Sequence, residues 1–417
     1  MSVYIQSANQ ISVQKPLSDE WFDNPILYDA PRVSTINPDF APYFSSLSSR
    51  RMCMLLKRAV LLSRLTLQEV SVEMPDAIIS GTGLGCIDNT EKFLYSIREN
   101  SEQFLQPTFF MQSTHNILSS TIAIDLKCHG YNNTFVHRGA SFENVLLDAI
   151  LQMEQERAQT VLVGGYDELT NDYYQFFNRI GVWDFASATS PSSLTSSASP
   201  ASYTSVASPA LPASPASCTT PASLTSVELS ASPTSSAPVA SSAVSASAPS
   251  ASPSSPVSPK KRCFAGEAAV SMLLSNSRNN LTVCEINDVE LMHKPTNGQM
   301  QESLDILLSK AGCTLSDIDA VLTGLNTHIV YDKVYRDAID HLFRNIPVLQ
   351  YKHLFGESFS SSALAVYVAQ TCLRKGYAPA ILSTDNDKDI NDIQRILVYN
   401  HYRNKTHSFI LLSSCSN

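Results

Sequence analysis

Residue types that do acid–base chemistry gather in two short segments of the sequence. These are residues 136–142, with His137 and Arg138, and residues 324–358, with His328, Lys352 and Glu357. Histidine and carboxyl side chains are the usual general acids and bases of enzymes, and helix N-termini attract anions. The candidate catalytic residues are therefore His328, Lys352 and Glu357, which could move a proton or stabilise negative charge on an oxygen.

Each candidate also has an ordinary structural explanation. His328 fits a buried histidine with a hydrogen-bond partner as well as it fits an active-site group. Glu357 is either a functional acid or a carboxylate that faces a helix N-terminus, where it adds ~0.3–1 kcal/mol. Lys352 is expected to form an ion pair with Glu357 or a nearby aspartate rather than to act in catalysis. His137 and Arg138 either bind an anion such as a phosphate or donate to loop carbonyls.

Two parts of the chain repeat the same order of elements. The repeated features are a β-prone run that ends at glycine, a Gly-x-Ser-Phe sequence that begins an apolar helical pattern, and a second short strand. They lie at residues 76–81, 139–153 and 160–163 in the first copy and at 319–324, 356–373 and 378–382 in the second. The shared order indicates a duplicated α/β unit.

Strands that alternate with helices predict a largely parallel sheet covered on both faces. The helices after Gly139 and Gly356 are apolar around much of their circumference, which predicts that they lie buried between sheets. Functional groups in such folds collect where parallel strands end and helices begin. The segments 136–142 and 324–358 are expected at these places.

A segment of low complexity separates the two copies. Residues 186–259 are dominated by Ser, Ala, Pro and Thr and contain one charged residue, Glu228. They hold too few large apolar side chains to offset the entropy of ordering, so a disordered insertion is expected. We therefore expect an N-terminal half over residues 1–185, the insertion over 186–260 and a C-terminal half over 261–417.

The overall composition argues against several function classes. The 417 residues carry 29 Lys and Arg against 38 Asp and Glu, and this net charge of −9 argues against binding of nucleic acid. We expect a cytoplasmic protein without membrane contact, because no apolar run is long enough for a span and the start lacks a signal-peptide pattern. The nine cysteines form no CxxC pair and the histidines no metal-ligand spacing, so no metal site is expected. In the turn that begins at Gly81, Cys86 stands where a dinucleotide-binding G-x-G-x-x-G sequence has its third glycine, so no nicotinamide cofactor is expected.

Six stretches together resemble the β-ketoacyl synthase family, which has the thiolase-like fold. In chain order they are Gly81-Thr-Gly-Leu-Gly85, Gly130-Tyr-Asn-Asn-Thr-Phe-Val136, Val161-Leu-Val-Gly-Gly165, Phe264-Ala-Gly-Glu-Ala-Ala269, Leu325-Asn-Thr-His328 and Lys352-His-Leu-Phe-Gly356. The resemblance spans almost all of the chain outside the low-complexity segment. It implies a duplicated five-layer α-β-α-β-α fold and acyl groups presented on the phosphopantetheine of an acyl carrier protein, with no cofactor bound by the chain itself.

Glycine stands at the position of the family's nucleophilic cysteine. In the family the cysteine follows the glycine of the preceding strand by nine residues and precedes the second glycine of a later Gly-Gly pair by 26. Both counts, from Gly130 and from Gly165, end at Gly139. Glycine offers no thiolate, so no acyl thioester can form on this chain at that position.

The resemblance carries over the other active-site groups only in part. His328 matches the first histidine, which in the family donates a hydrogen bond to the enolate oxygen formed during malonyl decarboxylation. Lys352 matches the lysine, whereas Glu357 replaces the second histidine and can donate a hydrogen bond only when protonated. The family's glycine-rich loop near the C-terminus is missing. This pattern resembles the chain-length-factor subunits, which pair with an active ketosynthase and do not condense.

A narrower resemblance concerns pigment assembly. The sequences Gln112-Ser-Thr-His-Asn116, His129-Gly-Tyr-Asn-Asn133 and Val136-His-Arg-Gly139 resemble the synthase-like subunits of aryl-polyene and flexirubin-type pathways. The main hypothesis is therefore a catalytically silent subunit in a heterodimer with an active ketosynthase, paired edge to edge through the strand at residues 131–137. Candidate residues of the acyl tunnel are Phe109, Phe110, Met111 and Phe142.

Two other hypotheses remain open. His328 and Glu357 could decarboxylate malonyl thioesters or transfer or hydrolyse acyl groups, which would make the chain an active enzyme. Alternatively, the chain is a non-catalytic scaffold whose Ser/Pro-rich segment is the functional part. Deleting residues 186–259 distinguishes the scaffold from the other two, because loop length has little effect on stability.

Overall fold

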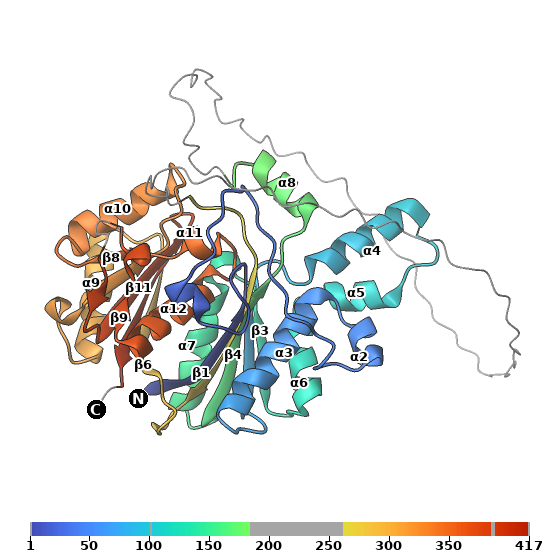
Figure 1. Ribbon diagram of the computed structural model, residues 1–417, viewed down its shortest axis with the longest axis horizontal. Coiled ribbons are helices and arrows are strands. Elements are labelled where there is room, and N and C mark those ends of the chain that lie inside the picture. Colours follow the sequence, from blue (N-terminus) through green and yellow to red (C-terminus); the bar gives the residue numbers. More distant parts are fainter. Residues whose placement is uncertain (1, 101, 184–261, 385–387, 416–417) are drawn as a thin grey trace, which may run out of the picture. The chain divides into compact units, whose positions relative to one another are not determined.

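The structure is a computed structural model that describes residues 2–100, 102–183, 262–384 and 388–415 (Figure 1). The predicted disordered insertion over residues 186–260 lies outside the described residues, and so do the boundaries expected at 185 and 261. Within the described ranges, no helix is both long enough and apolar enough to cross a membrane.

A ten-stranded sheet has the order β3-β2-β4-β5-β1-β6-β12-β11-β7-β8. Its strands are β1 (Val3–Ile11), β2 (Ala77–Gly81), β3 (Tyr131–Phe135), β4 (Thr160–Asp167), β5 (Ala268–Ser275), β6 (Cys284–His293), β7 (Ala320–Thr323), β8 (Val348–Gln350), β11 (Arg395–Tyr402) and β12 (Thr406–Ser414). The two halves of the sheet meet where residues 3–5 of β1 pair with residues 284–286 of β6.

The two halves of this sheet have the same topology. In the first half, β2 pairs in parallel with β3 and β4, and β5 and β1 follow antiparallel. In the second half, β7 pairs in parallel with β8 and β11, and β12 and β6 follow antiparallel. This match of order and direction confirms the predicted duplication. The expectation of a largely parallel sheet is wrong, because five of the nine neighbouring pairs in the large sheet are antiparallel.

Two helices, α7 (Ser141–Glu154) and α12 (Ser361–Lys375), lie between the halves (Figure 1). α7 contacts β2 and β4 of the first half and β6 of the second, whereas α12 contacts β11 and β12 as well as β1 and β5. All residues of α12 except the last two are buried, as its apolar circumference predicts. Phe142 and Val145 of α7 and Val366 of α12 join strands of both halves in one hydrophobic core.

Separate helices cover the outer faces. On the first half, α3 (Met54–Glu69) and α6 (Ile117–Leu126) pack on the sheet. On the second half, α9 (Asn297–Lys310) and α10 (Tyr331–Leu342) share a core with β7, β11 and β12. The succession of helix, sheet, helix, sheet and helix is the predicted five-layer architecture. The remaining helices are α1 (Glu20–Asp23), α2 (Ser46–Arg51), α4 (Ile87–Asn100), α5 (Pro107–Ser113), α8 (Asn171–Arg179) and α11 (Lys352–Phe355).

The strand predicted over residues 378–382 is wrong. The short strand β9 (Tyr377–Ala378) pairs with β10 (Ile390–Asn391) outside the large sheet, and Ala380–Leu382 form a 3₁₀ helix. Pro379 interrupts the run because it has no N–H to donate to a strand ladder. The strand that follows α12 in the large sheet is β11, and its last two residues, His401 and Tyr402, line the pocket described below.

Candidate functional site

A small pocket opens where β7 and β11 end and where the chain enters α12. Polar side chains on its wall are those of Asn326, Tyr331, Lys352, Glu357, Ser358, His401 and Arg403, and further aromatic ones are those of Trp183, Tyr335, Phe359 and Tyr402. The volume of its cavity is about 60 Å³, which is room for a few water molecules. Part of the segment predicted to carry chemistry, residues 324–358, therefore lines this pocket.

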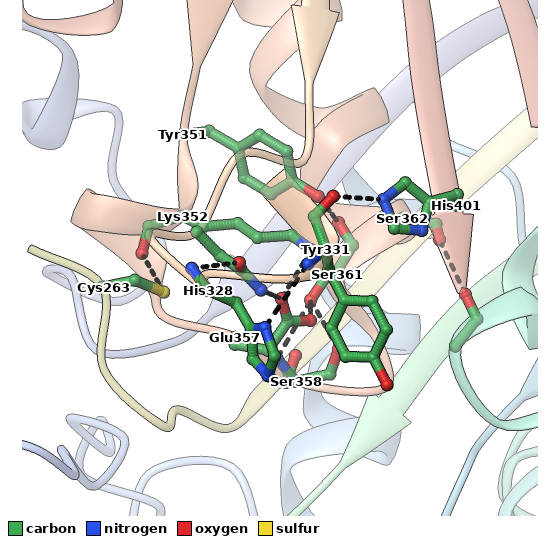
Figure 2. A network of polar contacts seen from close by, with 12 residues as sticks. Cys263, His328, Tyr331, Tyr351, Lys352, Glu357, Ser358, Ser361, Ser362 and His401 are labelled. Atoms are coloured by element: carbon green, nitrogen blue, oxygen red, sulfur yellow. Dashed lines mark hydrogen bonds and ion pairs between the residues drawn. The ribbon is translucent and has the colours of Figure 1, made fainter. Parts of the chain in front are cut away.

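Lys352 and Glu357 form a buried ion pair in this pocket (Figure 2), with Lys352 Nζ 2.7 Å from Glu357 Oε2. The same carboxylate oxygen accepts a hydrogen bond from Asn326 Nδ2 at 2.5 Å, and Oε1 accepts one from Ser361 Oγ at 3.1 Å. Burial by itself lowers the pKa of Lys352, but the adjacent carboxylate outweighs burial and holds that pKa well above its usual value. The predicted ion pair is confirmed, and Lys352 stays charged at neutral pH.

His328 lies in the loop between β7 and α10, and that loop holds its ring in one tautomer. Its backbone N–H donates to Asn326 Oδ1 at 3.1 Å. Its ring Nδ1 accepts the backbone N–H groups of Val330 and Tyr331 at 3.2 and 3.4 Å, so the proton of the neutral ring is on Nε2. Nε2 is buried and has no hydrogen-bond partner among the described residues. The ring centroid lies 4.3 Å from that of Tyr331, with the two rings tilted by 32°. An Nε2–H group is the kind of donor that stabilises an oxyanion, but His328 itself does not border the pocket.

Gly139 lies in a 3₁₀ helix, Arg138–Ala140, directly before α7. Its φ is outside the left-handed region, so its backbone would accept other residue types. Its carbonyl oxygen accepts a hydrogen bond from Ser362 Oγ of α12 at 3.2 Å. The space of a side chain here is taken by Tyr402, whose Cδ2 lies 2.5 Å from the position of an ideal Cβ.

One thiol beside the site escaped the sequence interpretation. Cys263 Sγ donates to the carbonyl oxygens of Lys352 and Phe264 at 3.5 and 3.6 Å. Burial, reinforced by the Glu357 carboxylate, raises the pKa of this thiol well above its usual value. A buried neutral thiol is a poor nucleophile, so Cys263 does not replace the missing cysteine.

His401, Tyr335 and Tyr402 also belong to the site and were not predicted. His401 Nε2 lies 3.0 Å from the carbonyl oxygen of Tyr331, and its ring centroid lies 4.2 Å from that of Tyr335. Burial lowers the pKa of His401 to about 3, so its ring is neutral at pH 7. The only signal in the sequence was the absence of the family's glycine-rich loop near the C-terminus, where this chain forms the β11–β12 hairpin.

The other residues singled out in the sequence lie outside this pocket. None of the four predicted tunnel residues borders it. Phe142 is buried in the central core, whereas Phe110 and Met111 are exposed on α5, so these three do not form one lining in this chain. His137 and Arg138 are exposed beside Gly139.

Solved structures that share this architecture are ketosynthases and related subunits. The ishigamide ketosynthase/chain length factor matches 100% of this chain and 99% of its own, with a TM-score of 0.70 and 13% sequence identity. A β-ketoacyl synthase from Burkholderia phymatum STM815 matches over 100% of both chains, with a TM-score of 0.68 and 12% identity. This chain has the ketosynthase fold. A type II PKS acyl-carrier protein in complex with its ketosynthase bound to the hexaketide gives a match over 99% of both chains, with a TM-score of 0.65 and 11% identity.

The likeness is visible in structure and not in sequence comparison. No protein-family profile matches this chain, and no curated protein matches it. The structural matches establish the thiolase-like ketosynthase fold that the motifs predicted. The roles of individual residues must therefore be argued from the geometry of this site.

Proposed function

We propose that this ketosynthase-like chain is a non-condensing subunit that works beside an active ketosynthase, in the manner of a chain length factor. The observation that carries the proposal is Gly139, whose side-chain space is filled by the ring of Tyr402. Condensation needs a thiolate to hold the growing acyl chain, and the neutral, buried Cys263 does not supply one. Glu357 stands in place of the second histidine, and its oxygens accept hydrogen bonds from Lys352, Asn326 and Ser361, so it offers an enolate no N–H donor.

A subunit of this kind belongs to biosynthesis of the fatty acid or polyketide type, in which acyl groups arrive on the phosphopantetheine of an acyl carrier protein. Two structures with this fold support the assignment, because one is a ketosynthase/chain length factor and another is a ketosynthase in complex with its acyl carrier protein. The motifs at residues 112–116 and 129–139 favour assembly of polyene pigments of the aryl-polyene or flexirubin type.

One edge of the sheet and the helices beside it suit the partner subunit. β3 pairs only with β2 among the described strands, so its other edge is open. α6 packs on β3, and α5 contacts α6. Ile124 of α6 is 78% exposed and Met111 of α5 is 62% exposed. An open strand edge flanked by apolar surface favours edge-to-edge association, and we infer that the active ketosynthase binds at β3.

Native mass spectrometry of the protein purified from its own cells tests this function. We expect a one-to-one complex with a ketosynthase that carries the nucleophilic cysteine. Met111→Asp combined with Ile124→Asp should weaken the complex by about tenfold or more, since ~1.4 kcal/mol corresponds to tenfold. Ile306→Asp, at an exposed position of α9 on the opposite outer layer, is the matched control and should leave binding unchanged. A chain that elongates acyl groups without any partner would refute the proposal.

One observation favours a second function, the decarboxylation of malonyl thioesters. The Nε2–H group of His328 is buried without a partner among the described residues, and such a donor stabilises the enolate that remains after carbon dioxide leaves. Turnover of malonyl-coenzyme A that disappears in His328→Ala would establish this activity. Release of carbon dioxide equal to that of buffer excludes it.

The scaffold hypothesis needs a separate experiment. Under the subunit proposal, a chain that lacks residues 186–259 still forms the complex with the ketosynthase, because the length of a connection between ordered elements has little effect on their stability. Loss of the complex in this deletion, with folding retained, would favour the scaffold.

A further inference from the structure

The ring of Tyr402 occupies the place in which a nucleophilic side chain would stand. An ideal Cβ at Gly139 would lie 2.5 Å from Tyr402 Cδ2, 3.1 Å from Cγ and 3.3 Å from Cε2. Non-bonded carbon atoms are at their optimum at about 3.5–4.0 Å, so any side chain at position 139 overlaps the ring. The backbone of Gly139 itself has an ordinary φ, so only the ring requires a glycine there.

The backbone of Tyr402 is fixed by the tight turn that follows it. Tyr402 pairs with Thr406 at the end of the β11–β12 hairpin, and the Lys405 N–H donates to the Tyr402 carbonyl at 3.0 Å. Arg403 and Asn404, at the centre of the turn, both have left-handed φ values, 51° and 52°, as in a type I′ hairpin turn.

Asn404 anchors this turn to both strands of the hairpin. Its backbone N–H donates to His401 Nδ1 at 3.2 Å, and its Oδ1 lies 3.1 Å from His407 Nε2. Since Tyr402 is adjacent to His401 on β11, the backbone of Tyr402 cannot shift without breaking these contacts. The overlap at Gly139 is therefore not relieved by a simple movement of the turn.

Neighbouring side chains hold the ring in place as well. The Arg403 guanidinium lies 5.7 Å from the ring centroid of Tyr402, and the Phe359 ring centroid lies 6.1 Å from it. Both contacts are of attractive types. Tyr402 lines the pocket together with Phe359 and Lys352, whereas Gly139 does not border the pocket. The ring thus stands between the pocket and the start of α7.

We propose that Tyr402 is the residue that closes this site to a nucleophile and to an acyl group, and that the glycine at position 139 is a steric requirement of the Tyr402 ring. The inference rests on the proposed non-condensing function and deepens it, because it makes the loss of the nucleophile and the presence of the tyrosine a single feature. A cysteine restored at position 139 is then insufficient to open the site.

The stability of the full-length chain by itself tests the proposal. Gly139→Ala lowers the melting temperature by several degrees while the ring is present, and it does not lower it in the Tyr402→Ala background, because neighbouring residues couple. Tyr402→Phe is the matched control: it keeps the ring and loses only the hydroxyl, so Gly139→Ala stays destabilising in that background.

Reactivity gives a second, independent measurement. Iodoacetamide labels position 139 at least about tenfold faster in Gly139→Cys combined with Tyr402→Ala than in Gly139→Cys alone, since access controls the rate of a thiol. Peptide mapping separates this position from Cys263, which carries a buried thiol.

The outcomes decide between the two proposals. An equal loss of melting temperature with and without the ring, or equal labelling rates, overturns the role of Tyr402. If Gly139→Ala fails to fold, a folded double variant supports that role, and failure of both variants overturns it. Absence of a ketosynthase partner, with the coupling between positions 139 and 402 intact, refutes the proposed function and leaves the steric role of Tyr402 standing.

Discussion

Breaking the buried ion pair between Lys352 and Glu357 should cost more stability than removing both charges. Lys352→Met keeps most of the length of the side chain and leaves the Glu357 carboxylate without a counter-ion. The two side chains are 7% and 20% exposed, so water screens the pair poorly. Loss of one partner from a buried pair costs about 3–5 kcal/mol. Because Glu357 keeps Asn326 and Ser361 as donors, we expect the lower end of that range, about 3 kcal/mol.

A double variant isolates the uncompensated charge as the cause. In Lys352→Met combined with Glu357→Gln, no charge remains. The amide oxygen of the glutamine, at the place of Oε2, can still accept the hydrogen bond of Asn326, and its NH2 group, at the place of Oε1, can donate to Ser361 Oγ instead. Its stability should return to within about 1 kcal/mol of the wild type. The raised pKa of Lys352 means that the pair contributes fully below the unfolded pKa of lysine and is lost only as the pH rises through the folded value. The differences should therefore be the same at about pH 6 and pH 8.

Urea unfolding followed by circular dichroism measures these free energies. Lys310→Met is the matched control, because Lys310 lies 2.7 and 3.0 Å from Asp288 and Glu290 but is 55% exposed. An exposed pair contributes about 0–1 kcal/mol. An effect of Lys352→Met no larger than that of Lys310→Met, or a double variant no more stable than the single one, would refute the reasoning.

Three further predictions concern buried titratable groups. Burial raises the pKa of Glu143 in the folded chain, so the wild type loses stability as the pH rises above the pKa of the unfolded chain. In urea unfolding, the free energy of Glu143→Gln relative to the wild type should therefore increase between about pH 5 and pH 8, and a constant difference would contradict this. Burial lowers the pKa of His407 to about 4, so the wild type should lose stability as the pH falls from about 6.5 towards 4, and thermal melts of His407→Gln should show a smaller loss. The Cys263 thiol, whose pKa burial raises, should resist iodoacetamide in the folded chain at pH 8 and react after unfolding. Rapid labelling in the folded chain would return Cys263 to consideration as a nucleophile.

Local patterns in the sequence were enough to predict the duplicated architecture. The β-prone runs at residues 76–81 and 319–324 became β2 and β7, and the apolar patterns after Gly139 and Gly356 became α7 and α12. These signals can be read from the sequence because a buried strand or helix needs apolar residues at its own period. The strand expected over residues 378–382 shows the limit of such patterns. Pro379 interrupts that run, and the next strand of the large sheet is β11.

The candidate site divides in the same way between sequence and tertiary structure. The resemblance to the β-ketoacyl synthases, counted from Gly130 and Gly165, predicted a vacant nucleophile position at Gly139. The short separation of Lys352 and Glu357 sufficed to predict their pairing. Sequence patterns could not show that His328 carries its proton on Nε2, because that depends on the backbone N–H groups of Val330 and Tyr331 that the loop turns toward its ring.

Only the tertiary structure decided what fills the space above Gly139. Tyr402 reaches that place because β11 lies beside the start of α7 and because the turn after Tyr402 holds its ring there. The sequence around Gly139 does not indicate Tyr402 as its neighbour, nor the reverse, since the two residues come from different halves of the duplicated fold. Contacts between distant segments depend on how whole layers pack and on strand register, and no pattern of neighbouring residues encodes them.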